Sequence, residues 1–484
     1  MQRITPDRPW PLLDVAATRA IEQSAAANLP PHALMERAGL AVARLALALA
    51  PHAKTVWLAC GPGNNGGDGF EAAVHLREWG KDVTVTWLGE EARAPADAKH
   101  ALQRARDAGA AFVSEPPANW DIAIDALLGI GSTRPMAHDM ATVASLVSSR
   151  PGCPVLAVDV PSGLDADTGT GQAVRATHTL SLLTLKPGLF TAGGRDASGV
   201  VWFDGLGVDI AASTPTARLA ATIAPSTRAH DSHKGRFGDV VIVGGAPGMA
   251  GAALLAGSGA LHSGAGRVFV ALLDEGAIGV DASQPELMFR SFATIDLSSM
   301  AVACGCGGGD AVRAHLPKVL STARSLVLDA DALNAIAGDT QLQTLLRARV
   351  QRGRPTVLTP HPLEAARLLG LTTSQVQANR LEAATRLSEK FGCVAVLKGS
   401  GTIVAAPGEV PSINPTGSGR LATGGTGDVL AGMIAARLAG GEGAFDAATR
   451  AVFAHGMAAD RWPAGKSLTA GRLAAALDGG SSPP

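Results

Sequence analysis

The sequence has no tyrosine, and aromatic residues make up only 4% of its 484 positions. Charged residues account for 17%, and 41 basic against 42 acidic side chains leave a formal net charge of −1. Because there is no basic tract, we expect no binding to nucleic acid or to a membrane surface. The most apolar early run, residues 38–50, is interrupted by Arg44 and is too short to span a bilayer.

Cysteine is also scarce. Five cysteines, an odd number, stand at positions 60, 153, 304, 306 and 393, and their spacing matches neither a disulfide framework nor a zinc site. Cys304 and Cys306 lie one residue apart, and without a second pair they are read as loop residues rather than metal ligands. The first fourteen residues lack the apolar segment of a signal peptide. We therefore expect a protein of the reducing cytoplasm.

Hydrophobic residues make up 46% of the chain, a proportion typical of globular proteins, and the length predicts two or three domains. Two helices are expected first, over residues 15–28 and 32–49. Short apolar strands then alternate with helices, which predicts an α/β fold with a mostly parallel, doubly wound sheet. The expected strands are TVWLAC, VTVTWL, IAIDALL, VLAVDV and TLSLLTL.

Residues 211–229 are rich in Ala, Thr, Ser and Pro and are expected to form a linker. A second α/β series follows, with strands expected at DVVIVGG, RVFVALL, MAVACG, SLVLDAD, TVLTPH and CVAVLKG. Six of the seven tryptophans precede the linker, as two modules of different origin would explain. We expect one domain over residues 1–215 and another over 225–484.

The segment TGGTGD, residues 423–428, precedes an expected helix over 429–440. Its glycines allow a tight turn and a close backbone approach, and a helix N-terminus attracts phosphate or a developing oxyanion. Asp428 at the first helical turn would be placed as a general base or acid. The alternative is a glycine-rich turn in which Asp428 only caps the helix.

In the first half, residues 61–66 match GxGxxG between a strand and a helix. The adjacent Asp68 would repel a phosphate, and Asn64 and Asn65 replace the small residues of a pyrophosphate cradle. Amides beside a carboxylate suit a polar ligand or a hard cation better.

Two further expected strands end in aspartates, Asp125 and Asp159, and each is followed by a polar loop. Ligands of open α/β sheets bind beyond the carboxyl ends of strands, so these loops should form one polar site. Alternatively, each aspartate caps the following turn or helix.

The motifs GPGNNGGDG, DALLGIG and VDVPSGLD together resemble the NAD(P)H-hydrate epimerase family, over about residues 10 to 210. The resemblance implies a Rossmann-like three-layer domain that interconverts the R and S epimers of hydrated NADH or NADPH. It also implies that the substrate is lined by Asn64, Asn65, Gly66, Gly67, Asp68, Gly129, Ile130, Gly131, Ser132, Thr133, Arg134, Pro135 and Asp159.

By the same resemblance, Asp159 would handle the proton, with Lys186 nearby, although Lys186 could also be a surface residue before a turn. The K⁺ ligands would be Asn65, Asp125 and Ser162. The chain departs from the family pattern at Phe70, where tyrosine is common. It also departs at Ile130 and Ser132, within the commoner GTGL.

The second half carries GCGGG (305–309), DADALN (329–334), TPHPLE (359–364) and KGSGT (398–402). KGSGT follows a strand but lacks the Walker spacing, so it is not a P-loop. With ATGGTGDVLAG these motifs resemble the ADP/ATP-dependent NAD(P)H-hydrate dehydratase family, over about 230 to 475, which implies a ribokinase-like fold. The family more often has GPGLG and HPGE, where this chain has Cys306, Gly308 and Leu363.

This resemblance implies residue roles for two ligands. The adenine nucleotide would contact Lys398, Gly399, Ser400, Gly401, Thr402 and Gly427. The hydrated nicotinamide would contact Ala252, Gly309, His361 and Asp428.

The implied reaction transfers a phosphoryl group from ADP or ATP, with Mg²⁺, to the ring hydroxyl of NADHX or NADPHX; Asp428 takes the proton. The epimerase domain would use K⁺. We further expect a homo-oligomer. One alternative is a ribokinase-type kinase of a small alcohol fused to a ligand-binding domain. Another treats the first half as a dinucleotide sensor or scaffold.

Overall fold

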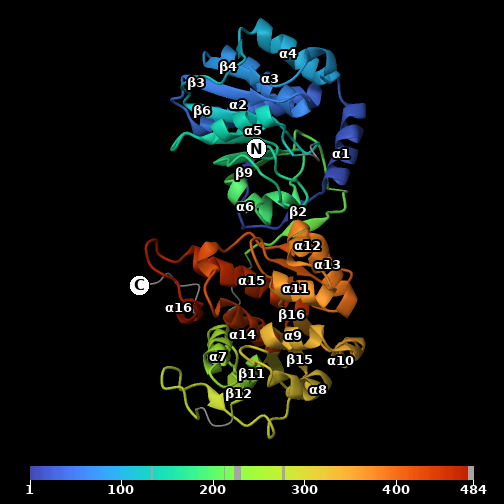
Figure 1. The fold of residues 1–484 in the computed structure, drawn as a ribbon, viewed down its shortest axis with the longest axis vertical. Coiled ribbons are helices and arrows are strands. Elements are labelled where there is room, and N and C mark those ends of the chain that lie inside the picture. Colours follow the sequence, from blue (N-terminus) through green and yellow to red (C-terminus); the bar gives the residue numbers. More distant parts are fainter. Residues whose placement is uncertain (132–134, 212, 223–229, 275–277, 478–484) are drawn as a thin grey trace. The chain divides into compact units, whose positions relative to one another are not determined.

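The computed structural model describes residues 1–131, 135–211, 213–222, 230–274 and 278–477 (Figure 1). The chain forms two compact units, one comprising Met1–Thr5 and Trp10–Ala217, the other Pro6–Pro9 and Arg218–Pro484. The functional domains 1–215 and 225–484 stay a prediction. Among the helices in the described ranges, none is long and apolar enough to cross a membrane.

Two helices open the first unit, as predicted. α1 spans Val15–Asn28, and the Asp14 side chain caps it by accepting a hydrogen bond from the Ala17 N–H at 2.8 Å. α2 spans Ala33–Leu49 and begins one residue later than predicted, because His32 takes a left-handed conformation with φ 66°.

The sheet of the first unit confirms the five predicted strands. It contains β1 Gln2–Arg3, β3 Thr55–Cys60, β4 Asp82–Trp87, β5 Ala111–Val113, β6 Ile122–Ala126, β7 Val155–Val158, β8 His178–Leu182 and β9 Val200–Asp204. Their order is β1-β9-β8-β7-β6-β3-β4-β5, and all neighbours are parallel except β1 and β9. The strand order reverses between β3 and β6, so ligands are expected beyond their carboxyl ends.

Helices cover both faces of this sheet (Figure 1). The remaining elements are β2 Trp10–Leu12, α3 Asn64–Glu78, η1 Glu91–Arg93, α4 Ala96–Asp107, α5 His138–Val147, η2 Pro187–Phe190 and α6 Gly194–Ala197. In β3, Val56 and Leu58 pack in a core with α2, α3 and α4, whereas Trp57 and Ala59 pack with α5. This alternation gives the predicted three layers.

The second unit has a larger sheet that confirms the second set of predicted strands. It contains β10 Ala217–Leu219, β11 Asp239–Gly244, β12 Arg267–Leu272, β13 Met288–Phe289, β14 Ala301–Cys304, β15 Ser325–Leu328, β16 Thr356–Leu358, β17 Val394–Leu397, β18 Ile403–Ala405 and β19 Ser412–Ile413. The order is β13-β12-β11-β14-β15-β16-β17-β18-β19-β10, parallel from β13 to β17. Here the strand order reverses between β11 and β14.

The linker prediction for residues 211–229 is wrong in part, because β10 lies inside it and pairs with β19. Ala217 and Leu219 are buried and Arg218 is exposed, so the strand alternates as expected of a β-strand. Three residues are too few for this alternation to stand out from a composition typical of linkers.

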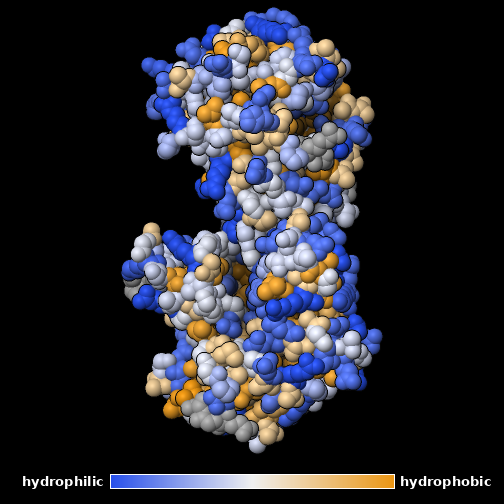
Figure 2. Space-filling model, viewed as in Figure 1, coloured by the Kyte–Doolittle hydropathy of each residue, from blue (hydrophilic) through white to orange (hydrophobic). Residues whose placement is uncertain are grey.

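Helices also flank the second sheet. They are η3 Lys234–Phe237, α7 Ala250–His262, α8 Val312–Thr322, α9 Ala330–Ala337, α10 Thr340–Gln351, α11 Pro362–Leu369, α12 Thr373–Ala378, α13 Arg380–Phe391, η4 Gly419–Leu421, α14 Thr426–Ala439, α15 Ala444–Asp460 and α16 Ala470–Ala475. On the face of the molecule drawn in Figure 2, hydrophilic and hydrophobic side chains are interspersed over the surface.

α14 begins three residues earlier than predicted and ends one residue earlier. The cause is Gly425, whose φ of 90° lets the chain turn directly into the helix. Gly427 and Asp428 therefore lie within the first helical turn. Leu430, Ile434 and Leu438, which are spaced four residues apart along this helix, are buried.

Glycines allow α14 to pack against α7 with direct backbone contact. A Cβ at Gly432 would lie far inside van der Waals distance of the Ala256 carbonyl oxygen, and a Cβ at Gly259 would do the same with the Val429 carbonyl oxygen. This contact sets the position of α14 and hence of the residues in its first turn.

We predict that Gly432→Ala lowers the free energy of unfolding of the second unit by about 1–3 kcal/mol, because the added methyl group overpacks the contact between the helices. The matched control is Gly471→Ala in α16, where an added Cβ meets nothing within 4 Å and should be neutral or stabilising. Urea denaturation measures both midpoints. Equal midpoints for the two variants would contradict the prediction.

Candidate functional site

A cavity of about 630 Å³ lies in the first unit, where the loops after β3 and β6 meet. Most of the predicted substrate residues line it. They are Asn64, Asn65, Asp68, Gly129, Ile130, Gly131 and Asp159, and Lys186 lines it as well. The sheet topology therefore brings together loops that are distant from one another in the sequence.

Some predicted residues are not at the cavity wall. Gly66 and Gly67 are buried within α3, where a side chain would collide with the Gly61 carbonyl and with Met35. Both glycines therefore permit close packing behind the site instead of lining it. Pro135 is exposed and is not among the lining residues. Residues 132–134, which include three predicted contacts (Ser132, Thr133 and Arg134), lie outside the described residues.

Asp159 and Lys186 form a buried ion pair in the cavity wall. The Lys186 side chain is fully buried, and its ammonium also donates to the Leu182 carbonyl at 2.7 Å. Asp159 additionally accepts from the Leu182 N–H at 3.0 Å, and its φ of 66° is unusual for a residue with a side chain. Such strain is found where a fold holds a functional group in one orientation. Because the Lys186 side chain is buried, the alternative that it is a surface residue before a turn is wrong.

Two further carboxyl groups share this cavity, Glu22 from α1 and Asp68 from α3. Burial raises the pKa of Asp68 well above its ordinary value, and the charge of Asp159 raises it further. Burial also raises the pKa of Glu22, again with a contribution from Asp159. Glu22 and Asp68 are therefore easier to protonate than ordinary carboxyl groups, which suits proton transfer.

Glu22 was not predicted from the sequence, although it lies one helical turn after Thr18, which also lines the cavity. Thr18 and Glu22 lie four residues apart and hence on one face of α1, and this spacing was the available signal.

Asp125 and Ser162 meet beneath the cavity. The Ser162 hydroxyl donates to Asp125 Oδ1 at 2.5 Å, and the Ser162 N–H donates to Oδ2 at 2.8 Å. Burial raises the pKa of Asp125 to about 6, because a carboxylate is costly to bury, although the hydrogen bonds from Ser162 oppose this effect. Asn65 packs against Gly129, and its buried amide nitrogen has no hydrogen-bond partner among the described residues.

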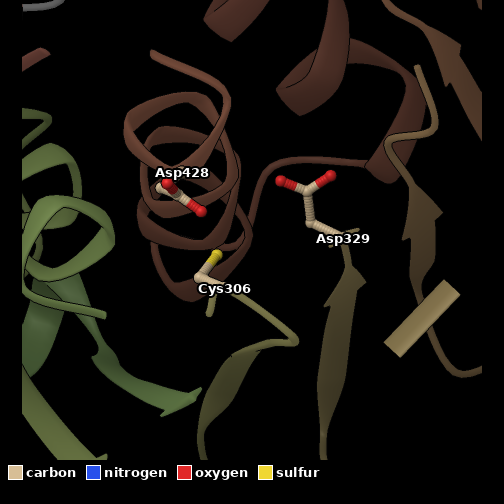
Figure 3. A group of neighbouring side chains, drawn as sticks. All are labelled: Cys306, Asp329 and Asp428. Carbon is tan, nitrogen blue, oxygen red and sulfur yellow. The ribbon is translucent and has the colours of Figure 1, made fainter. Parts of the chain in front are cut away.

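In the second unit, three side chains from separate elements converge (Figure 3). Cys306 follows β14, Asp329 follows β15 and Asp428 lies in the first turn of α14; their sulfur and oxygen atoms are all within 4.8 Å of one another. The expectation that the cysteines are loop residues is wrong for Cys304, which ends β14, whereas Cys306 does lie in the loop after that strand and is buried in this cluster.

Lys398 completes the cluster at the carboxyl end of β17. Its ammonium lies 2.6 Å from Asp329 Oδ1, and a Cβ at Gly427 would be 3.2 Å from the same nitrogen. Lys398 therefore contacts the N-terminus of α14, where unpaired N–H groups and the helix dipole favour an anion. Burial opposes the charge on Lys398, but Asp329 and Glu364 outweigh this effect and raise its pKa.

Asp428 has the electrostatics of a base. Burial raises its pKa to about 6, and the charge of Asp329 adds to this, whereas the hydrogen bond with Cys306 and the charge of Lys398 lower it. Burial and the two nearby aspartates raise the pKa of the Cys306 thiol, so the thiol stays protonated and donates to Asp428. A carboxylate with a pKa near neutrality suits general base catalysis.

The other predicted contacts lie around this cluster. Ala252 in α7 lies next to Gly307, and Gly309 in the loop after β14 lies next to Met249. Both are at the point where the strand order reverses. His361 caps α11 by accepting from the N–H groups of Leu363 and Glu364, so part of its role is structural. In the KGSGT loop, Gly399 and Ser400 are exposed, and the Thr402 hydroxyl donates to the Gly399 carbonyl at 3.0 Å.

Asp329 and Glu364 belong to the DADALN and TPHPLE motifs, but no role for either residue was predicted from the sequence. Burial raises the pKa of Glu364 to about 7, partly opposed by the charge of Lys398. The available signal was that each acid follows a buried strand of a parallel sheet, as the predicted site residues do.

Both units thus have the architecture of an α/β enzyme whose ligands bind where the strand order of a parallel sheet reverses. Comparisons with known proteins identify the family. A model described as "NAD(P)H-hydrate dehydratase" matches residues 240–478, and one described as "YjeF-related protein N-terminus" matches residues 31–188.

Relatives match both halves together. The bifunctional NAD(P)H-hydrate repair enzyme Nnr of Escherichia coli is 36% identical over 88% of this chain and 84% of its own length. The enzyme of the same name from Vibrio cholerae is 38% identical, over 88% of each chain. The chain therefore belongs to the family of bifunctional NAD(P)H-hydrate repair enzymes. This assignment agrees with the expected Rossmann-like first unit and ribokinase-like second unit.

Two solved structures are also similar. The ADP/ATP-dependent NAD(P)H-hydrate dehydratase of Bacillus subtilis, co-crystallised with ATP and Mg²⁺, is 33% identical and covers 52% of this chain and 91% of its own, with a TM-score of 0.44. A ribokinase-like superfamily protein of Enterococcus faecalis is 27% identical and covers 52% of this chain and 89% of its own, with a TM-score of 0.43.

Proposed function

We propose that the second unit dehydrates the S epimer of hydrated NADH or NADPH at the expense of ADP or ATP, and that the first unit interconverts the R and S epimers. One observation carries the proposal. Asp428, with a pKa near neutrality, lies in the first turn of α14, beside the Lys398 ammonium and the glycine-rich N-terminus that favours phosphate.

In the second unit, the ring hydroxyl of the substrate is a poor leaving group until it is phosphorylated. The hydroxyl oxygen forms a bond to the transferred phosphorus, the bond from that phosphorus to the nucleotide breaks, and Asp428 accepts the hydroxyl proton. The α14 N–H groups and Lys398 stabilise the phosphate charge. The bond from the ring carbon to the phosphate oxygen then breaks, a proton leaves the adjacent ring carbon, and the loss of inorganic phosphate restores the double bond of the dihydronicotinamide ring.

Mg²⁺ would neutralise nucleotide phosphates here. The carboxylate oxygens of Asp329 suit this hard cation, whereas the thiol of Cys306 does not, and Asp428 would stay free of the metal to act as the base. The choice between ADP and ATP stays open in this proposal.

In the first unit, Asp159 would move the proton during epimerisation, and Lys186 would hold its carboxylate in place. Asn65, Asp125 and Ser162 would hold K⁺. The donor set fits, because Asp125 is a buried carboxylate whose described partners are hydrogen-bond donors, and a monovalent cation would offset its burial cost. The homo-oligomer and the cytoplasmic location stay predictions.

We predict that Asp428→Asn lowers kcat/KM of dehydration by about 10²–10⁴-fold, the usual contribution of a general base, and leaves epimerisation unchanged. Asp159→Asn should lower kcat/KM of epimerisation and leave dehydration of the S epimer unchanged. Both are measured by incubating an R/S mixture of hydrated NADH with ADP or ATP, Mg²⁺ and K⁺ and following each epimer by chromatography.

The same assay separates the alternatives. A ribokinase-type kinase would accumulate a phosphorylated alcohol, whereas a dehydratase releases phosphate and restores the absorbance of the reduced nicotinamide. If the first half were a sensor or scaffold, Asp159→Asn would keep its affinity for the substrate and remove no turnover. Unchanged epimerisation by this variant would therefore contradict the assignment of the first unit.

We predict that kcat/KM of dehydration falls about tenfold per pH unit below pH 6, because protonated Asp428 cannot accept the hydroxyl proton. Above its pKa the profile should level off. Cys306→Ala removes the hydrogen bond that lowers the Asp428 pKa, so its acid limb should move to higher pH. A pH–rate profile of both proteins that is flat from pH 5 to 8 would contradict this role.

We predict that K⁺ accelerates epimerisation and raises the melting temperature of the first unit, and that Asp125→Asn weakens K⁺ affinity about tenfold or more by removing a charged ligand. Potassium chloride is titrated against tetramethylammonium chloride at constant ionic strength, with dehydration as the internal control. Identical responses to the two salts would exclude the site.

A further inference from the structure

Arg380, the first residue of α13, is a buried arginine to which sequence analysis assigned no role. Its exposed fraction is 1%. One guanidinium nitrogen donates to the carbonyl oxygens of Leu397 at 3.3 Å and Lys398 at 3.2 Å, and another donates to Gln377 Oε1 at 2.7 Å. Burial lowers the pKa of Arg380 to about 10, so the guanidinium keeps its charge at neutral pH.

The two carbonyls belong to the peptides that lead into the KGSGT loop. In a trans peptide the C=O and the N–H point in opposite directions. Holding the Leu397 carbonyl therefore turns the Lys398 N–H away from Arg380, and that N–H donates to the Pro360 carbonyl at 2.9 Å. Holding the Lys398 carbonyl likewise turns the Gly399 N–H away from Arg380.

Gly399 is exposed, and its N–H has no acceptor among the residues that the structure describes. Its φ is 133°, and a Cβ at this position would lie 2.9 Å from Arg380 Nη1. The guanidinium thus packs directly behind the Gly399 backbone. A positive charge behind a peptide plane also makes the outward N–H a better donor to an anion.

The same residue, Lys398, carries the ammonium that contacts Asp329 and the first turn of α14. Arg380 therefore fixes the main chain from which both the Lys398 side chain and the Gly399 N–H project.

We propose that Arg380 is a positioning residue for nucleotide binding: it holds the Leu397 and Lys398 carbonyls so that the Gly399 N–H and the Lys398 ammonium face the phosphates of an adenine nucleotide. This inference rests on the proposed function of the second unit.

The test is ADP binding by the full chain, measured by titration calorimetry. Arg380→Met keeps the length of the side chain but removes its donors, and the Kd for ADP should rise about 10–100-fold, the effect of losing hydrogen bonds to a charged group. The Kd of Arg380→Lys should lie between those of the unmodified protein and Arg380→Met, because one ammonium cannot reproduce the planar fork of donors of a guanidinium. At saturating nucleotide, kcat should fall by a smaller factor than the affinity for ADP, because Asp428 and the N–H groups of α14 stay in place.

Arg349 provides a matched control. It is buried to the same 1%, and its guanidinium also donates to main-chain carbonyls, those of Ala323, Arg324 and Pro355. Arg349→Met should lower the melting temperature as Arg380→Met does but leave the Kd for ADP within about twofold, since those carbonyls lie outside the KGSGT loop.

A second variant covers the case in which Arg380→Met does not fold. Gly399→Ala leaves the arginine in place but pushes the peptide away from it, so it should weaken ADP binding similarly, and combining it with Arg380→Lys should give less than the product of the two effects. An unchanged Kd in folded Arg380→Met or Gly399→Ala, or an equal change in Arg349→Met, would overturn the inference. If the unmodified protein binds neither ADP nor ATP, the proposed function fails as well.

Discussion

The ion pair between Lys398 and Asp329 is the interaction on which the second unit's site depends. It joins the carboxyl ends of β17 and β15, and its ammonium rests against the first turn of α14 at Gly427. Buried charges must be paired, so removing either partner would leave the other uncompensated among buried residues. Asp329 also lies within 4.8 Å of Asp428. The pair therefore places the Lys398 ammonium close to the proposed base.

Both sites hold an aspartate close to a buried lysine, but the lysine pairs with a different kind of partner in each site. In the first unit, a fully buried lysine pairs with Asp159 directly, and neighbouring acids carry raised pKa values. In the second unit, the lysine pairs with Asp329, a different aspartate from the proposed base, so burial raises the pKa of Asp428 to about 6. One carboxylate is thus held in place by its counter-ion, while the other is left able to gain and lose a proton near neutral pH.

Departures from the family pattern acquire physical meaning in the structure. Phe70, where tyrosine is common, is 1% exposed and packs edge-on against Trp87 at a ring distance of 5.7 Å, so a hydroxyl would have to be accommodated in the core. Cys306, where proline is common, places a protonated thiol against Asp428.

The sequence alone determined the α/β class, the two modules, α1 and the strands around which both sheets form, because each of these depends on local periodicity and capping. It also located most of the polar loops, since these follow recognisable strands. Only the tertiary structure decided which loops meet: Glu22 reaches the cavity of Asp159, and Asp329 pairs with Lys398, 69 residues later. The roles of Arg380 and β10 could not be predicted from the sequence either, because they depend on partners that are distant in the sequence. Such pairings follow from strand order and helix packing, which are set by the whole core and not by any local pattern.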